Sequence, residues 1–363
     1  MKTVMYRKDD REPVSSDGNG VNDFIGFQPT SKKALTTIRK IEEIAEATNK
    51  AGVKCSISKI EFDMIIKSGT GLKNDGHKFL GYPVIGYQND MQSSGSCLAS
   101  ADDTACPWDP RIKGIFFFEI GIGINISKIG PFLSDVKKLR DKISRNSFCG
   151  VELYNGFLMR YVKASSAYLG KQEDSVEIEI TYYRSKDPST PRLYEDVLEE
   201  IEQMALMKYG ALPHWGKNRN LAFDGVLKKY NKYEAFLQVK SKYDPQGLFS
   251  NEWTDGVLEI GQVGVIIKKD GCALEGLCVC SEDKHCAPDK GYFCKSGRVY
   301  KEARVCRRQE EVEPSFFRAF FQMPGWCVWT GILLLSSWFA LHTRADPSQL
   351  FKSSLWPTLE PRS

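Results

Sequence analysis

The chain has 363 residues, of which 42% are hydrophobic, and this is ample for a folded core, so a wholly disordered chain is excluded. Lysine and arginine number 50 against 46 acidic residues, which leaves a formal charge of +4. The basic residues are dispersed, and clusters such as Lys137–Arg140 are typical of the solvent-exposed face of an amphipathic helix. Nothing in this pattern supports nucleic-acid binding, and the length allows two or three domains.

The first half of the chain predicts helices and strands in alternation. Residues 1–30 are polar and rich in turn-forming residues, and we expect little independent structure there. Apolar residues at helical spacing predict a helix over Lys32–Asn49, whereas short apolar runs separated by Gly and Asp predict strands over Cys55–Gly86. Arg111–Ile126 has the pattern of a mostly buried strand, and Phe132–Ile143 has helical spacing.

The next segments group strands together and helices after them. Leu153–Ala164 and Val176–Tyr183 are predicted strands, and Leu193–Tyr209 and Asp224–Tyr243 are predicted helices. This grouping indicates the α+β class, with a largely antiparallel sheet and helices on one face. We place this domain at residues 31–260.

Eleven cysteines are many for a protein of a reducing compartment, and six of them crowd into residues 268–307. Zinc is the competing interpretation, but the segment has no CxxC pair, contains one histidine, His285, and has cysteine spacings that fit no common zinc finger. We therefore predict no metal site and a small module held by three disulfides, whose pairing the sequence leaves open. The six residues are Cys272, Cys278, Cys280, Cys286, Cys294 and Cys306.

Four upstream cysteines could add two more disulfides, namely Cys55, Cys97, Cys106 and Cys149, of which Cys97 and Cys106 could close a loop. The glycosylation sequon Asn125-Ile126-Ser127 agrees with passage through the secretory pathway. No signal peptide accompanies these features, because Met1–Lys8 reaches charged residues before an apolar segment can form. We expect that the sequence has lost its original N-terminus and that the protein is extracellular, apoplastic or membrane-bound.

Residues 315–345 form a hydrophobic tail of different character. Between Arg318 and Arg344 there is no formally charged residue, and tryptophans flank an apolar run, as in a membrane-spanning segment. Pro324 and Gly325 oppose this interpretation, and translated sequence foreign to the fold is the alternative.

The run LPHWGKNR at Leu212–Arg219 follows a predicted helix end, because Gly210 accepts a left-handed conformation and Pro213 cannot continue a helix. A turn of this kind can hold an imidazole, an indole, an ammonium and a guanidinium in fixed directions, which suits a polar ligand or an anionic cofactor. A helix-capping loop with one stacked Trp is the alternative.

Six runs carry a resemblance to a known family: DFIGF at 23–27, GYPVIGYQN at 81–89, ACPWDPR at 105–111, YVKASSAYLG at 161–170, LPHWGKNR at 212–219 and YDPQGLF at 243–249. Over most of residues 4–307 the chain resembles the plant L-gulonolactone oxidases, within the D-arabinono-1,4-lactone oxidase family. The resemblance implies an FAD flavoprotein of the vanillyl-alcohol-oxidase type. Such enzymes oxidise L-gulono-1,4-lactone or a related aldono-1,4-lactone at the 2-hydroxyl, in L-ascorbate biosynthesis, with oxygen or another electron acceptor.

The same resemblance implies site residues. Arg160, Thr181 and Lys217 correspond to residues that hold the substrate beside the flavin, and His214 and Trp215 are expected on the flavin side of the pocket. Cations suit this chemistry because they favour the developing alkoxide.

One position departs from the family pattern, which has a Glu two residues before the Arg, because this chain has Leu158 there. Glu179 lies on the same strand face as Thr181 and is a candidate replacement, although an exposed carboxylate in an alternating strand is the expected environment for it.

The cofactor domain also departs from the family. Gly69-Thr70-Gly71 and Gly121-Ile122-Gly123 lack the features of a dinucleotide-binding loop, so residues 1–30 are interpreted as a remnant linker from the missing FAD-binding region. The chain alone is expected to bind FAD weakly or not at all. A catalytically inactive, secreted or membrane-attached lactone-binding protein is the alternative function, which Leu158 favours. A zinc or redox protein built on the cysteines is disfavoured by their spacing.

Overall fold

A computed structural model describes residues 30–67, 73–74, 77–78, 104–105, 117–143, 157–187, 189–261 and 264–309, together with positions 10, 148 and 149. Nearly all of the predicted linker, both Cys97 and Cys106, and the hydrophobic tail at 315–345 lie outside the described residues. Within the described ranges, no helix combines the length and the apolarity that crossing a bilayer requires.

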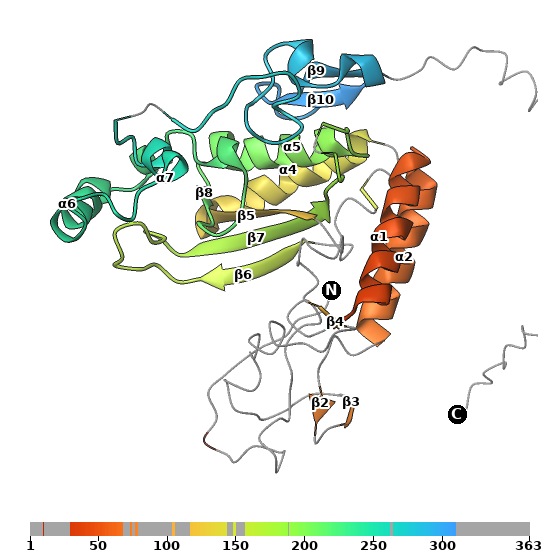
Figure 1. Ribbon diagram of the computed structural model, residues 1–363, viewed down its shortest axis with the longest axis horizontal. Helices are drawn as coiled ribbons and strands as arrows, with labels where there is room; N and C mark the ends of the chain where they lie inside the picture. The colour runs from red at the N-terminus through yellow and green to blue at the C-terminus, as the bar shows by residue number, and fades with distance from the viewer. Residues whose placement is uncertain are drawn as a thin grey trace, which may run out of the picture. The chain divides into compact units, whose positions relative to one another are not determined.

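A four-stranded antiparallel sheet lies at the centre of the described structure (Figure 1). Its strand order is β6 (Leu158–Val162), β7 (Ser175–Tyr183), β5 (Phe117–Asn125) and β8 (Leu212–Pro213). The long pair β5 and β7 runs through nine residue pairs, from Phe117 opposite Tyr183 to Asn125 opposite Ser175. The predicted antiparallel sheet and its three longer strands are confirmed.

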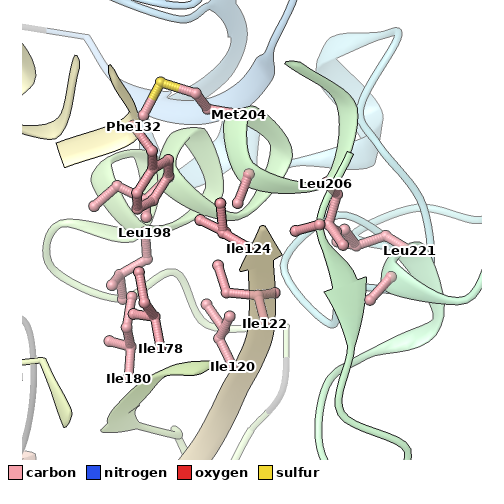
Figure 2. Close-up of a cluster of buried hydrophobic side chains, with 14 of the residues drawn as sticks. Ile120, Ile122, Ile124, Phe132, Ile178, Ile180, Leu198, Met204, Leu206 and Leu221 are labelled. Carbon is pink, nitrogen blue, oxygen red and sulfur yellow. The ribbon is translucent and has the colours of Figure 1, made fainter. Parts of the chain in front are cut away.

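One face of the sheet forms the hydrophobic core (Figure 2). Alternate residues of β5 and β7 point to this face, and their isoleucines are fully buried. Helices α4 (Ile129–Lys142) and α5 (Glu195–Gln203) cover them, and α5 continues as a π-helical turn through Lys208. Each fully buried isoleucine contributes about 1.5–3 kcal/mol. The buried isoleucines are Ile120, Ile122, Ile124, Ile178 and Ile180.

Two helices form the N-terminal part of the described structure, and one of them was predicted differently. Helix α1 (Lys32–Ala47) confirms its prediction, whereas α2 (Ala51–Lys67) occupies a segment predicted as strands. Packing against α1 determines the local structure here and outweighs the strand preference of the isoleucines. Lys54 of α2 pairs with Glu46 of α1. One of the two further disulfides predicted among the upstream cysteines is present and joins Cys55 to Cys149.

The remaining N-terminal strands are two residues long. Strand β1 (Thr30–Ser31) pairs with β4 (Thr104–Ala105), and β2 (Lys73–Asn74) pairs with β3 (His77–Lys78).

The helix predicted over Asp224–Tyr243 is interrupted. A 3₁₀ turn covers Val226–Lys229, and α6 (Tyr233–Tyr243) starts after Tyr230, which is extended and buried in the core. Burial of this aromatic ring explains the break, because a continuous helix would carry the ring away from its pocket. A further helix, α7 (Glu252–Val257), was not predicted, and Asn251 and Thr254 form its capping box.

The cysteine module is a small unit whose strands β9 (Tyr292–Ser296) and β10 (Arg304–Arg308) form a hairpin (Figure 1). The three predicted disulfides are confirmed, and their pairing is Cys272–Cys278, Cys280–Cys294 and Cys286–Cys306. All six cysteines are buried, so the disulfides themselves make up most of the module's core.

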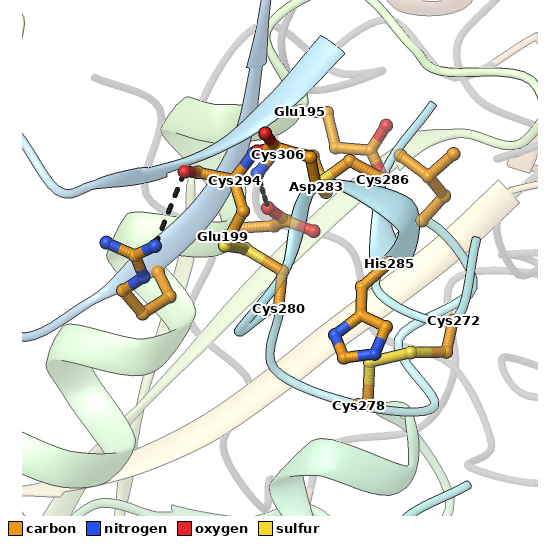
Figure 3. The surroundings of a disulfide bond; sticks show 12 residues. Glu195, Glu199, Cys272, Cys278, Cys280, Asp283, His285, Cys286, Cys294 and Cys306 are labelled. Carbon is orange, nitrogen blue, oxygen red and sulfur yellow. Dashed lines mark hydrogen bonds between the residues drawn. A yellow bond between two sulfur atoms is a disulfide. The ribbon is translucent and has the colours of Figure 1, made fainter. Parts of the chain in front are cut away.

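The module binds to α5 through main-chain N–H groups and through ion pairs of Arg298 and Arg307 with Asp196. The Glu200 carboxylate accepts hydrogen bonds from the backbone N–H groups of Arg298, Val299 and Tyr300, at 2.6, 2.5 and 2.9 Å. Glu199 accepts from the N–H of Cys306 at 2.8 Å (Figure 3). These carboxylates therefore satisfy backbone donors that would otherwise be buried without partners.

Replacing Glu200 with Ala is expected to lower the free energy of unfolding by about 3 kcal/mol or more, because three N–H groups lose a charged acceptor. Urea denaturation would measure this loss. Glu302→Ala is the control, since Glu302 is exposed in the same module. Equal stability of the two variants would contradict this account of how the module is held.

Candidate active site

The face of the sheet opposite the core carries charged residues. Strand alternation puts Glu119 of β5, Glu179 and Thr181 of β7, and Arg160 of β6 on this face, opposite to the isoleucines. Thr181 is the cross-strand partner of Glu119, and Leu158 is the partner of Glu179. Two of the three predicted substrate-binding residues, Arg160 and Thr181, therefore share one face.

The loop after β8 brings the third, Lys217, onto the same face. His214 donates its backbone N–H to the carbonyl of Gly121 at 2.8 Å, which continues the pairing of β8 with β5. Asn218 has a positive φ of 78°, and its side-chain amide bonds both the N–H and the carbonyl of Gly121, at 2.9 and 2.8 Å. The loop is thus fastened to β5 at both ends, with Lys217 between the two attachments.

Glycines in β5 make room for this loop. A Cβ atom at Gly121 would lie 2.9 Å from the Cβ of His214 and 3.1 Å from the Cδ of Lys217. At Gly123 an added Cβ would collide with the side chain of Lys171. The short Gly-Ile-Gly run therefore serves neither as a phosphate loop nor as a simple turn, because it lets cationic side chains lie flat against the strand.

Four side chains form what we call the charged cluster: Glu119, Arg160, Glu179 and Lys217. The Lys217 Nζ lies 2.5 Å from Glu119 Oε1 and 3.1 Å from Glu179 Oε2. The other oxygen of Glu179 accepts a hydrogen bond from the Arg160 guanidinium. The prediction that Glu179 is exposed is wrong, since its side chain is only 6% exposed and pairs with both Arg160 and Lys217.

A second ion pair lies beside the charged cluster. Lys171 Nζ is 3.1 Å from Glu177 Oε2, and both side chains are largely buried. Burial lowers the pKa of Lys171, although Glu177 acts in the opposite direction. Sequence reasoning missed Lys171, because it lies in the loop between β6 and β7. Its contact with the sheet depends on how this loop folds back, which the local sequence does not indicate.

His214 and Trp215 differ in their surroundings. His214 Nδ1 accepts a hydrogen bond from the Gly216 N–H at 3.0 Å, and the ring lies beside the charged cluster. The Trp215 indole donates to the carbonyl of Leu169 at 3.1 Å and stacks on Tyr230, with ring centroids 5.8 Å apart. Trp215 is thus a stacked residue at the edge of the core, and contact of either side chain with a flavin stays a prediction.

Arg219, which supplies the guanidinium of the LPHWGKNR run, ends the same loop on the core side. It is buried and pairs with Glu202 of α5 at 2.7 Å. Its guanidinium also lies over the Phe118 ring, 5.5 Å from the centroid. The run from His214 to Arg219 therefore connects the charged face with the helix layer.

Comparisons with known proteins identify the family of this chain. A profile described as D-arabinono-1,4-lactone oxidase matches residues 114–257, and one described as L-gulonolactone oxidase 2-like, C-terminal domain, matches residues 269–308. "Probable truncated L-gulonolactone oxidase 7, mitochondrial" of Arabidopsis thaliana is 58% identical over 232 residues, covering 63% of this chain and 91% of that protein. The chain belongs to the L-gulonolactone oxidase family.

Longer members of the L-gulonolactone oxidase family are also similar. "Probable L-gulonolactone oxidase 6" and "L-gulonolactone oxidase 2", both of Arabidopsis thaliana, are 56% and 55% identical over 313 residues, covering 85% of this chain. The matches cover 51% and 52% of those proteins, so the chain spans about half the length of these curated relatives.

In this member of the L-gulonolactone oxidase family, Gly121→Ala is expected to destabilise the fold by about 1–3 kcal/mol, because the new methyl overpacks against His214 and Lys217. Gly130→Ala is the matched control, since a Cβ there meets nothing within 4 Å, and in helix α4 it should stabilise by about 0.5–1 kcal/mol. Thermal and urea unfolding would compare them. A stable Gly121→Ala protein would show that the loop does not lie against β5.

The stability of this L-gulonolactone oxidase family member should also depend on pH through the ionisation of His214. Burial lowers the pKa of His214 from its ordinary value of 6.5, and Lys217 and Lys171 lower it further against the effect of Glu177. A lowered pKa in the folded state favours the neutral ring, so the stabilisation is complete above pH 6.5 and is lost as the pH falls below it.

Between pH 7.5 and pH 5, the wild type should therefore lose more stability than His214→Gln, whose side chain does not titrate. NMR titration of the His214 ring is the direct measurement. A midpoint at or above 6.5 would contradict the predicted direction.

Proposed function

We propose that this chain provides the lactone-binding wall of an FAD-dependent aldonolactone oxidase, acting on L-gulono-1,4-lactone or a related aldono-1,4-lactone at the 2-hydroxyl. In this proposal residues 31–260 are the substrate, or cap, domain. One observation carries it: Arg160 and Lys217, from separate parts of the chain, converge on the buried carboxylate of Glu179 at one face of the sheet. The family membership supports the same activity.

The chemistry of the charged cluster fits alcohol oxidation. A hydroxyl that becomes a carbonyl loses its proton while the adjacent carbon loses a hydride, so negative charge develops on the oxygen. Arg160 is 51% exposed and can donate hydrogen bonds to that oxygen, while Lys217 adds a second positive charge. Thr181, on the same face, would orient a neighbouring hydroxyl of the lactone.

FAD, on which this family depends, would accept the hydride. The described residues fit the substrate side of such a cofactor, because Lys217 and His214 lie against glycine on a face that the core helices leave uncovered. The described residues include no glycine-rich loop leading into a helix of the kind that cradles a pyrophosphate. His214 and Trp215 are the predicted cofactor contacts, and oxygen or another acceptor would complete the reaction in L-ascorbate biosynthesis.

We also infer that the chain folds in an oxidising compartment of the secretory pathway. Four disulfides among the described residues support this inference, because such a density is rare in reducing compartments. The sequon residue Asn125 supports it as well, since it lies at the partly exposed end of β5 and is followed by an exposed Ser127.

Binding of L-gulono-1,4-lactone to the chain, followed by ligand-observed NMR, tests the proposal. Lys217→Ala and Arg160→Ala should each weaken binding at least about tenfold, because each removes a charge-assisted hydrogen bond. Lys228→Ala is the control, since this lysine is 73% exposed and lies outside the charged cluster. Absence of binding by the wild type, or unchanged binding by both cluster variants, would refute the site.

A further inference from the structure

We propose that Glu179 is the positioning residue of the lactone site, which holds Arg160 and Lys217 in the relative orientation that the ligand requires. The inference rests on the proposed function and assigns a role within the same site. Glu179 would act through the two cations, so contact with the lactone is not part of its role.

The first argument is that the two carboxylate oxygens of Glu179 contact different cations. Oε1 accepts a hydrogen bond from the Arg160 guanidinium of β6, and Oε2 lies 3.1 Å from the Lys217 ammonium of the loop after β8. A carboxylate is planar and rigid, so two partners on separate oxygens are fixed in direction and separation together. Two cations that would otherwise repel each other are thus kept at one place on the sheet.

The second argument is burial. The Glu179 side chain is 6% exposed, whereas that of Arg160 is 51% exposed. Among the described residues, the Arg160 guanidinium has one hydrogen-bond partner, Glu179, and about half of the side chain is accessible to solvent. The buried Glu179 carboxylate therefore orients the guanidinium of Arg160, and the exposed part of Arg160 is available to bind the ligand.

The third argument is that the other carboxylates of this face do not contact both cations. Among the described residues, the Glu119 carboxylate pairs with Lys217 and not with Arg160 and is 28% exposed, and Glu177 pairs with Lys171. Within the described part of the chain, Glu179 alone among carboxylates contacts both Arg160 and Lys217.

The register of the sheet provides a relocation test. Leu158 is the cross-strand partner of Glu179 and is 53% exposed, so a carboxylate placed there lies on the same face. Side chains opposite each other in an antiparallel pair are about 4.5–5.5 Å apart at Cβ, which a glutamate can bridge. A Leu158→Glu, Glu179→Gln double variant would therefore return a carboxylate to within reach of Arg160.

The experiment measures two quantities in the full chain: the affinity for L-gulono-1,4-lactone, and the rate at which acetic anhydride acylates Lys217, followed by mass spectrometry. Glu179→Gln should bind the lactone at least tenfold more weakly and should acylate Lys217 several-fold faster. The double variant should recover most of the lost affinity. Glu177→Gln is the matched control, being the same change at a buried position on the same strand and face, and should leave Lys217 acylation unchanged.

The outcomes separate the two proposals. If the wild type does not bind lactone, the proposed function fails, while the Lys217 acylation rates still test the positioning by Glu179. If Glu179→Gln retains wild-type affinity and acylation, the positioning role is wrong. Equal weakening by Glu179→Gln and Glu177→Gln, without recovery in the double variant, would show a general structural effect and would also overturn the inference.

Discussion

The pairing of β5 with β7 is the interaction on which the rest of the structure depends. Its nine residue pairs place the isoleucines on one face and the carboxylates and Thr181 on the other. A shift of one residue in either strand would turn that strand's isoleucines to the charged face and its carboxylates into the helix layer. The register is therefore enforced by the core, and the positions of Glu179 and Thr181 follow from hydrophobic packing beneath them.

A single short loop links the layers that this pairing creates. Asn218 fastens it to β5, Lys217 extends over the charged face, and Arg219 turns back to Glu202 of α5. Leu221 then donates its N–H to the carbonyl of Gly276 in the cysteine-rich part of the chain, at 3.2 Å. Changes in the packing of α5 can thus reach Lys217 through a few covalently connected residues.

The sequence predicted the elements whose pattern is set locally. Alternating isoleucines determine β5 and β7, and the cysteine count indicated the disulfides. Helix α2 was missed because contact with α1, rather than local preference, decides its structure, and the break at Tyr230 comes from a pocket that distant residues build. Arg160, Thr181 and Lys217 were nominated by resemblance alone. Burial of Glu179 could not be foreseen, because the lysine that pairs with it is 38 residues further along the chain.

The attachment of the cysteine module to α5 has a consequence for sequence divergence. Glu200 and Glu199 recognise amide groups, which every amino acid except proline carries. These hydrogen bonds therefore demand only that positions 298–300 are not proline, and their side chains are constrained separately, by the pairing of Arg298 with Asp196 and by packing of Val299 and Tyr300 against the core. Glu200 has less latitude, since both of its carboxylate oxygens accept N–H groups and a side chain with one acceptor oxygen would leave part of this set without a partner.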